Sequence, residues 1–424
     1  MAVATRLFAQ LDAGIYERLP AALRHPLNRY TRDSLADPGV WVRNWNRSFE
    51  FSLDAPAVGV LLLHGMSDSP YSLRALGQAL HRAGAHVLGL RLPGHGTLPS
   101  GLVSVRGEDM TAAVVLAMHH LAEQVGERPL FIVGYSNGAA LGVLYAIDSL
   151  EDATLPPVAG LVLISPAIGV SPVAALAVWQ ARLGVLLGLD KLAWNSILPE
   201  YDPYQYKSFA VNAGDLVHRL TGHIQVGLRR LARAGRLEAF PPVLALVSVV
   251  DATVSVPALV DGPLRLLPPG AHELVLFDIN RRAVDAPLLS DDPAAAIQRL
   301  RDDPERPFSL SVMSNRAPDD ARVRVQTSPP GETDSVGRDL DLGWPARVYS
   351  LSHVALPFAP DDPLYGEYPA RTGSGLHLGD IALRGERGVL RISAEERLRL
   401  RWNPFFPYLR ARVLEALGLV RDVR

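Results

Sequence analysis

One serine lies where a buried strand is expected to change into a helix. The string Gly134-Tyr135-Ser136-Asn137-Gly138 follows the apolar run 129–133 and opens the helical stretch 139–144. A serine on such a sharp turn has a strained backbone and an exposed hydroxyl, and the flanking glycines avoid clashes with neighbouring backbone. This context, more than the five letters, predicts that Ser136 is a nucleophile rather than a buried turn serine.

A serine nucleophile needs partners further along the chain. Its hydroxyl reacts poorly near neutral pH unless an oriented histidine accepts the proton. Where the serine stands on a strand-to-helix turn, an acid and then a histidine follow it, each on a loop after a later strand. Asp251 follows the apolar run 242–250, and His353 follows an expected final strand, 347–351. We therefore predict a triad of Ser136, Asp251 and His353.

Acyl transfer also requires two backbone N–H groups that stabilise the oxyanion. The residue after the nucleophile, Asn137, would supply one of them at the N-terminus of the following helix. Met66, in the loop after the apolar strand 58–63, would supply the other.

The elements that must position these residues alternate along the chain. Short apolar strands and longer amphipathic stretches predict a mostly parallel sheet with helices on both faces, an α/β fold. The expected strands are 58–63, 86–90, 129–133, 158–164, 242–250, 273–277 and 347–351, and the expected helices begin near 69, 108 and 137.

The alternation pauses twice, which suggests how the domains are organised. Residues 1–57 are expected to form an N-terminal extension with the first strand or strands. The core comprises 58–169 and 237–424, with an insertion at about 280–342 that contains a strand near 308–312.

The first pause is the mainly helical stretch 170–236, which begins at about Val170 and ends at about Arg236. It is expected to form a lid over the carboxyl edge of the sheet. Its leucines and tryptophans, Trp179 and Trp194, either pack as core or line an acyl pocket. Substrate-binding residues are expected within this lid, but the sequence does not single any of them out.

Five short segments match a known pattern: His64-Gly65-Met66-Ser67-Asp68-Ser69-Pro70, Arg91-Leu92-Pro93-Gly94-His95-Gly96, the Ser136 turn, Asp251-Ala252-Thr253-Val254 and Ser352-His353. With them the chain resembles α/β-hydrolases of the carboxylesterase and monoacylglycerol-lipase type, well over about 58–251 and in parts beyond. The resemblance implies a Ser-His-Asp triad on Ser136, His353 and Asp251, no metal or organic cofactor, and a lid that selects the acyl or alcohol group.

The spacing of the acid and the histidine departs from the pattern of the family. The usual separation is some tens of residues, whereas 102 positions separate Asp251 from His353. An insertion at 280–342 would explain the difference. His272 is nearer, but it precedes a strand and would lie at the opposite edge. Asp261 is the alternative acid.

Composition excludes several classes of protein and site. The chain has 424 residues, a net charge of −2 and no dominant cluster of Lys and Arg, which argues against a nucleic-acid partner. It has no cysteine, so disulfides and thiolate metal sites are excluded. His64 and His95 beside glycine turns are expected to bond nearby backbone, and the adjacent His119 and His120 point to different faces of a helix. No metal site is expected, and we expect a soluble, cytoplasmic chain.

The expected activity is hydrolysis of a carboxylic ester with a hydrophobic acyl or alcohol group. An amide or peptide hydrolase of the proline-aminopeptidase type is an alternative, since Glu200, Asp202 or Asp215 in the lid could bind a substrate amine. A non-catalytic ligand-binding protein is a second alternative. The expected partner is a small-molecule ester. The Arg- and aromatic-rich tail, 397–409, is expected to pack on its own domain rather than on a membrane or a second subunit.

Overall fold

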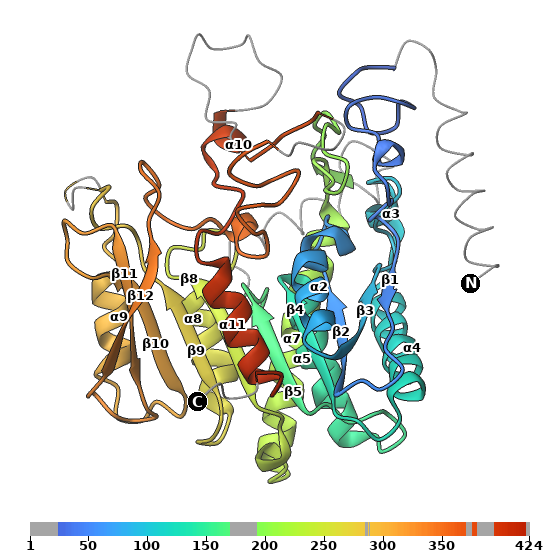
Figure 1. Cartoon of the computed structure of the whole chain (residues 1–424). Helices are drawn as coiled ribbons and strands as arrows, with labels where there is room; N and C mark the ends of the chain where they lie inside the picture. The colour runs from blue at the N-terminus through green and yellow to red at the C-terminus, as the bar shows by residue number, and fades with distance from the viewer. Residues whose placement is uncertain are drawn as a thin grey trace.

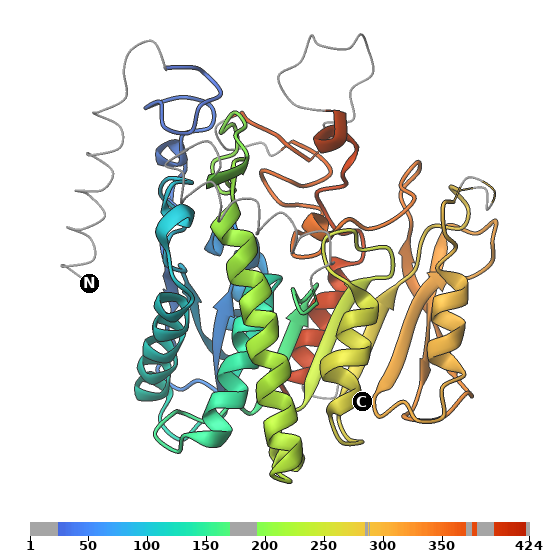
Figure 2. The same cartoon turned by 180° about the vertical axis from the view of Figure 1, so that it is seen from behind.

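A large twisted sheet crosses the molecule, and helices cover both of its faces (Figures 1 and 2). The computed structural model describes residues 24–169, 193–284, 287, 289–369, 375–379 and 394–420. The sheet has the strand order β1-β3-β2-β4-β5-β8-β9-β10-β11-β12. Its strands are β1 (Phe49–Phe51), β2 (Val58–Leu63), β3 (Ala85–Leu90), β4 (Leu130–Tyr135), β5 (Gly160–Ile164), β8 (Val243–Ser248), β9 (Glu273–Phe277), β10 (Ser309–Asn315), β11 (Arg322–Ser328) and β12 (Val336–Gly343).

The strands from β3 to β10 run parallel, and the outer strands β1, β11 and β12 run antiparallel to their neighbours. Every residue of β2, β4, β5 and β8 is buried. Strands buried on both faces read as continuous apolar runs, which is the pattern seen in the sequence. The expected α/β architecture is confirmed, and the carboxyl ends of the parallel strands share one edge.

Two helical layers enclose the sheet. In Figure 1, α2 and α11 lie in front of it, and Figure 2 shows α4, α5, α7, α8 and α9 on the other face. Alternate residues of each strand divide between two separate cores, so that Leu61 packs toward one layer and Leu62 toward the other. The helices are α2 (Arg74–Arg82), α3 (Gly101–Ser104), α4 (Gly107–Val125), α5 (Asn137–Glu151), α7 (Val211–Arg233), α8 (Val256–Leu259), α9 (Ala294–Arg301), α10 (Ala394–Leu398) and α11 (Phe406–Ala416).

The parts of the segment expected to form a lid, 170–236, lie in different places. Its residues 170–192, including Val170 and Trp179, lie outside the described residues. Beyond them, β6 (Trp194–Ser196) pairs antiparallel with β7 (Phe209–Ala210). The long helix α7 instead packs along α5: a Cβ on Gly227 would lie 2.8 Å from a methyl carbon of Ile147. The apolar face of α7 therefore belongs to the layer that covers the sheet, contrary to the lid prediction.

Arg236, the expected last residue of the lid, lies at the edge of the sheet opposite the carboxyl ends of the parallel strands, where a lid was expected. Its guanidinium donates to the carbonyl oxygen of Leu150, in the last turn of α5, and its backbone N–H donates to the carbonyl of Leu231 at 2.9 Å. Because α5 begins beside Ser136 at the carboxyl edge and runs antiparallel to the strands, its last turn lies at the opposite edge. Helix α7 carries the chain from one edge to the other, so the prediction that the lid extends to Arg236 is wrong.

The insertion after β9 widens the sheet. The strand expected near 308–312 is β10, and β11 and β12 add an antiparallel extension. Arg306, which is 2% exposed, holds the base of this extension together. Its guanidinium donates to the carbonyl oxygens of Leu300 at 2.7 Å, Phe308 at 2.9 Å and Pro329 at 2.6 Å.

The expected final strand, 347–351, does not form, and this prediction is wrong. Arg347 has a φ of +68°, a left-handed conformation that interrupts an extended chain. The carbonyl oxygens of Val348 and Tyr349 bond Asn280 instead of a neighbouring strand. The chain approaches His353 as an irregular segment.

The C-terminal helix α11 packs on its own domain, as the sequence predicts. Phe405, Phe406, Leu409 and Val413 are buried against the front face of the sheet. None of the helices in the described ranges combines the length and apolar character needed to cross a bilayer.

Candidate active site

Ser136 occupies a strained turn between β4 and α5. It is the N-cap residue of α5, with φ +53° and ψ −118°, which few non-glycine residues adopt. Its backbone N–H donates to the carbonyl of Ile164 at 2.9 Å, and its carbonyl accepts from Ala139 and Ala167. These bonds to β5 and α5 hold the strained conformation. Ser136 is 9% exposed and lines a cavity.

Glycines allow this turn to pack closely against β2. A Cβ on Gly138 would lie 2.1 Å from the carbonyl oxygen of Leu63, and a Cβ on Gly134 would lie 2.4 Å from the backbone of Ala139. Both contacts involve backbone atoms, which cannot move aside as a side chain could. The glycines of the pattern are therefore required by sterics at this position.

Gly138→Ala is expected to lower the free energy of unfolding by about 3 kcal/mol or more, because the new methyl group overlaps the backbone of β2. Urea denaturation measures the effect. Gly222→Ala in α7 is the matched control: a Cβ at Gly222 would meet no atom within 4 Å, so this change should stabilise the helix by about 0.5–1 kcal/mol. Equal effects of the two substitutions would contradict the steric explanation.

Asp251 and His353 meet although 102 positions separate them. The Nδ1 atom of His353 lies 2.9 Å from Oδ2 of Asp251, and the two side chains are 5% and 0% exposed. Oδ1 of Asp251 accepts from the backbone N–H groups of Thr253 and Val254 at 2.8 and 3.0 Å. Burial opposes ionisation, but these bonds and the His353 contact outweigh it, so the pKa of Asp251 is lowered. A charged Asp251 can orient the imidazole.

Asn280, at the start of the insertion, is hydrogen-bonded to the segment that follows the insertion and leads to His353. Its side-chain amide donates to the carbonyl of Val348 at 2.7 Å, and its backbone N–H donates to the carbonyl of Tyr349 at 2.8 Å. Asn280 comes just after β9, so residues 348 and 349, which lead to His353, lie beside the carboxyl end of that strand. The Tyr135 hydroxyl, next to Ser136, also donates to the His353 carbonyl at 3.3 Å.

The two N–H groups expected to stabilise an oxyanion lie on loops that approach each other beside Ser136. A Cβ on Gly65 would lie 3.2 Å from Cβ of Ser136, which brings the loop carrying Met66 against the turn. Asn137 is the first residue of α5, and Met66 lines the same cavity as Ser136. No acceptor among the described residues bonds either backbone N–H.

His64 and His95 support these loops. His64 is 1% exposed; its Nδ1 contacts the Gly65 carbonyl at 2.8 Å, and its Nε2 accepts from the Leu92 N–H at 3.1 Å. His95 accepts from the Ser67 N–H at 3.1 Å through Nε2. Burial lowers the pKa of His95 to about 4, so its ring remains neutral and can accept. The expectation that both histidines bond nearby backbone is confirmed.

The cavity in front of Ser136 has a volume of about 380 Å³. Ser136 and His353 lie in its wall, together with Met66. Its apolar wall includes Phe209 and residues from the first turns of α7. The remaining polar lining residues are Ser67, Asp68, Asn195, Gln205, Thr253 and Arg399.

Only the first part of the described lid segment borders this cavity. The lining residues from the range 193–236 all lie between Asn195 and Val217, and Arg236 is not among them. The sequence did not indicate which part of the segment borders the cavity, because its helical pattern continues through α7 to about residue 236. The part of the described segment that borders the cavity is therefore limited to β6, the loop that carries Gln205, β7 and the start of α7.

Asp68 is an ionisable group in the cavity wall that the sequence reasoning did not single out. It is 5% exposed, and its Oδ1 accepts from the Ser69 N–H at 2.8 Å. The nearby Ser72 hydroxyl donates to the Ser69 carbonyl at 3.2 Å. Burial, only partly offset by these neighbours, raises the pKa of Asp68 to about 7.

The raised pKa predicts that Asp68 destabilises the fold at higher pH. The unfolded chain releases this proton near pH 4, while the folded chain retains it until about pH 7, so stability falls between these values. Asp68→Asn is expected to change unfolding little at pH 4 and to stabilise by about 2–4 kcal/mol at pH 8. Denaturation at both pH values measures the difference, and the same change at both would contradict the prediction.

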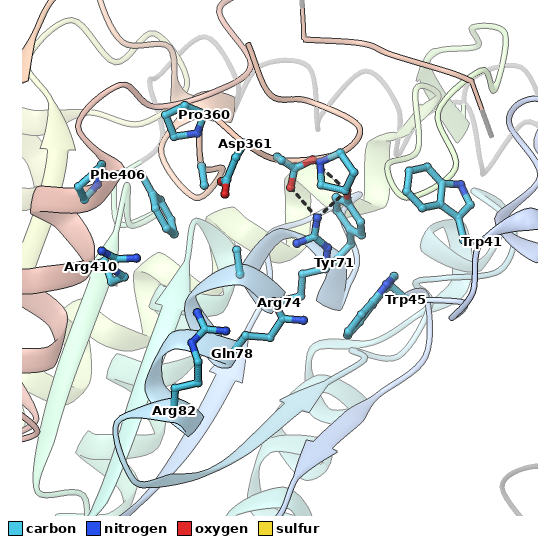
Figure 3. Close-up of a pocket in the computed structure, with 15 residues that line it drawn as sticks. Trp41, Trp45, Tyr71, Arg74, Gln78, Arg82, Pro360, Asp361, Phe406 and Arg410 are labelled. Carbon is cyan, nitrogen blue, oxygen red and sulfur yellow. Dashed lines mark hydrogen bonds and ion pairs between the residues drawn. The ribbon is translucent and has the colours of Figure 1, made fainter. Parts of the chain in front are cut away.

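A larger cavity, of about 670 Å³, lies between α2 and α11 (Figure 3). Arg74 and Asp362 form an ion pair at 2.9 Å in its wall, and Trp41 and Trp45 line one side. Ser136, Asp251 and His353 do not line this cavity. Of the residues predicted from the sequence to form a triad, Ser136 and His353 line the smaller cavity instead.

The alternatives considered for the acid and the histidine lie elsewhere. The Asp261 side chain is 67% exposed and pairs with Arg265. His272 precedes β9, at the opposite edge of the sheet from His353. Within the described residues, no three His, Asp or Glu side chains gather as metal ligands would.

Comparison with known proteins shows that part of the chain is similar to hydrolases. Residues 54–204 match the family described as serine aminopeptidase, S33. A thermostable monoacylglycerol lipase of Bacillus sp. (strain H-257) is 33% identical over 118 residues, which are 28% of this chain and 44% of that enzyme. The chain thus spans less than half the length of this relative.

Solved structures of lipolytic enzymes match about half of the chain. A structure from work on LipS and LipT, two metagenome-derived lipolytic enzymes, has a TM-score of 0.43 and 25% identity, covering 56% of this chain and 89% of that one. The monoacylglycerol lipase of Paleococcus ferrophilus has a TM-score of 0.39 and 20% identity, covering 55% and 88%. With its parallel sheet, two helical layers and strand-to-helix turn at Ser136, the chain has the α/β-hydrolase fold, and its residues 54–204 are similar to the S33 family.

Proposed function

We propose that the chain is a serine hydrolase that cleaves a carboxylic ester through an acyl-enzyme intermediate. The observation that carries this proposal is the 2.9 Å contact between Asp251 and His353, beside the cavity that Ser136 lines. A buried carboxylate that orients a histidine next to a strained serine is the arrangement that makes a hydroxyl nucleophilic.

In the proposed acylation step, Oγ of Ser136 attacks the ester carbonyl carbon, and His353 accepts the hydroxyl proton. The carbonyl oxygen becomes an oxyanion, which the N–H groups of Met66 and Asn137 stabilise. The C–O bond to the alcohol then breaks, and His353 gives its proton to the leaving oxygen. Asp251 stabilises the imidazolium and keeps the ring in the orientation that both transfers require.

Deacylation repeats these steps with water as the nucleophile. His353 accepts a proton from water, whose oxygen attacks the acyl carbon. When the bond to Ser136 breaks, the serine oxygen regains its proton from His353 and the carboxylic acid leaves. No atom outside the protein, the ester and water is needed for the cycle.

The cavity wall supports a substrate with a hydrophobic portion. Phe209, Val211 and Val217 line it near the start of α7 and offer apolar contact to an acyl chain or an alcohol group. The relative from Bacillus is a monoacylglycerol lipase, which is consistent with a hydrophobic ester.

The carboxylates considered for a peptidase are engaged elsewhere, which favours ester cleavage. Asp202 is fully buried against Lys207 at 3.1 Å, and Asp215 forms an ion pair with Arg219 at 2.6 Å. Glu200 accepts from the backbone N–H groups of Lys207 and Ser208. None of the three carboxylates belongs to the described cavity wall. An aminopeptidase needs a charged carboxylate to hold the substrate amine, and burial raises the pKa of Asp68, the one carboxyl group in the described wall, to about 7.

A fluorophosphonate probe tests the proposal against a non-catalytic binding protein. The probe should label the wild-type chain at one position, and peptide mass spectrometry should locate the label on Ser136. Heat-denatured protein is the control. Labelling that persists in Ser136→Ala, or no labelling of the folded chain, would contradict a nucleophilic Ser136.

A series of p-nitrophenyl esters tests the hydrophobic substrate. Turnover is expected to rise from acetate to chains of medium length as the apolar wall is filled, by about threefold per added CH₂. If acetate were cleaved far faster than every longer ester, the hydrophobic acyl preference would be wrong, although hydrolase activity would stand.

A further inference from the structure

Arg399 brings a positive charge into the wall of the cavity in front of Ser136. It follows α10, is half-buried, and is the one Lys or Arg among the described residues that line this cavity. Asp68 is the one acidic residue in the same wall. A guanidinium beside a nucleophile influences which substrates can enter.

The backbone around Arg399 is fixed on both sides. The Ser352 hydroxyl, next to His353, donates to the carbonyl of Leu400. Arg401 is 3% exposed and lies between Glu396 and Asp202, with its Nη1 atom 3.8 Å from Asp202. The chain at 399–401 is therefore held beside the histidine loop, and Arg399 is carried on this fixed segment.

Among the described residues, the guanidinium of Arg399 forms no ion pair or hydrogen bond. Against the effect of burial, Lys207, Arg401 and Arg399 together lower the pKa of Glu396, but this carboxylate pairs with Arg401 and lies 3.9 Å from Lys207. The carboxylate of Asp251 is hydrogen-bonded to His353. Burial raises the pKa of Asp68 to about 7, so this carboxyl is partly neutral at neutral pH. The cavity therefore lacks a full counter-charge for its cation.

We propose that the ester cleaved at Ser136 carries an anionic group, a carboxylate or a phosphate, which Arg399 binds. This inference rests on the proposed function and names its class of substrate. A planar guanidinium bonds such oxyanions through two parallel N–H donors, and this pairing is strong where water is partly excluded. The apolar wall at Phe209 and Val217 would hold the uncharged part of the same substrate.

Three chromogenic esters test the proposal and separate the two sides of the ester bond. They are p-nitrophenyl butyrate, which is neutral; mono-p-nitrophenyl glutarate, with a carboxylate on the acyl side; and 3-carboxy-4-nitrophenyl butyrate, with a carboxylate on the alcohol side. One of the anionic esters should have a kcat/KM at least about tenfold above that of the neutral ester.

Variants of Arg399 should change this preference selectively. Arg399→Gln is expected to lower kcat/KM for the preferred anionic ester by about 10- to 100-fold and to leave the neutral ester within about twofold. Arg399→Lys should retain part of the preference, since it keeps the charge but loses the planar fork. Arg397→Gln is the matched control: it removes a nearby positive charge outside the described cavity wall and should change neither rate.

Equilibrium binding to Ser136→Ala gives a readout that does not need turnover. This variant should bind the preferred anionic ester about tenfold more tightly than the neutral one, and Arg399→Gln in the same background should abolish the difference. Cleavage of the neutral ester in preference to both anionic esters, or an anionic preference that survives Arg399→Gln, would overturn the inference alone. Arg399-dependent binding without hydrolysis of any ester would uphold it and overturn the proposed function.

Discussion

Replacing Ser136 with alanine is expected to lower kcat for ester hydrolysis by about 10⁵- to 10⁶-fold and to change KM little. Alanine keeps the Cβ atom and removes the oxygen that would form the acyl-enzyme, so substrate can bind but the covalent step is lost. Any remaining rate would come from the Met66 and Asn137 N–H groups and from binding. Steady-state kinetics with p-nitrophenyl butyrate measures the loss.

Ser165 provides a matched control for this experiment. It is a second buried serine with a positive φ, +42°, at the end of β5, and it does not belong to the described wall of the cavity. Ser165→Ala therefore makes the same chemical change on a similar strained backbone and should retain activity within about threefold. Comparable losses in the two variants would show that the effect of Ser136→Ala came from the turn and not from the nucleophile.

Asp251→Asn is expected to lower kcat by about 10⁴-fold, the effect of losing the acid that fixes the histidine tautomer. The amide oxygen of asparagine can still accept from the N–H groups of Thr253 and Val254, so the loop should keep its shape. The amide N–H₂ would then face Nδ1 of His353, which would have to accept rather than donate. Nε2 would carry the proton and could no longer act as a base toward Ser136.

The other acid considered from the sequence is the control for this second prediction. Asp261→Asn changes an exposed side chain that pairs only with Arg265 among the described residues, and it should leave kcat within about twofold. A larger loss from Asp261→Asn than from Asp251→Asn would contradict the assignment of the acid. Circular dichroism of both variants should match the wild type.

The parts of the site that depend on short stretches of chain could be predicted from the sequence. The turn at Ser136 follows from an apolar strand, two glycines and a helix, all within about 20 residues, and the structure has each element where the pattern places it. Asp251 likewise follows β8 by a short turn. Such features are determined by local sterics and by the alternation of strands and helices.

The route of the chain to His353 could not be predicted in detail. The sequence favours a final strand before this histidine, because 347–351 contains Val348 and Tyr349, whose side chains favour strands, and the apolar Leu351. The structure has an irregular segment there, since Arg347 has a positive φ and the following carbonyl groups bond Asn280. Strand propensity is weak compared with such tertiary contacts.

The extent of the lid could not be predicted for a similar reason. An amphipathic helical pattern shows that α7 has an apolar face, but it does not show which surface covers that face. In the structure the face packs on α5, and the helix leads the chain to Arg236 beside Leu150, away from the cavity.

The sequence by itself determined the fold class, the turn at Ser136 and the order of the candidate residues along the chain, because apolar periodicity and glycine sterics act over neighbouring residues. Only the tertiary structure decided that Asp251 meets His353 across 102 positions, that Asn280 closes the insertion between them, and that Arg399 lines the cavity in front of Ser136. These contacts join distant segments, and their geometry depends on how the whole sheet and its loops pack.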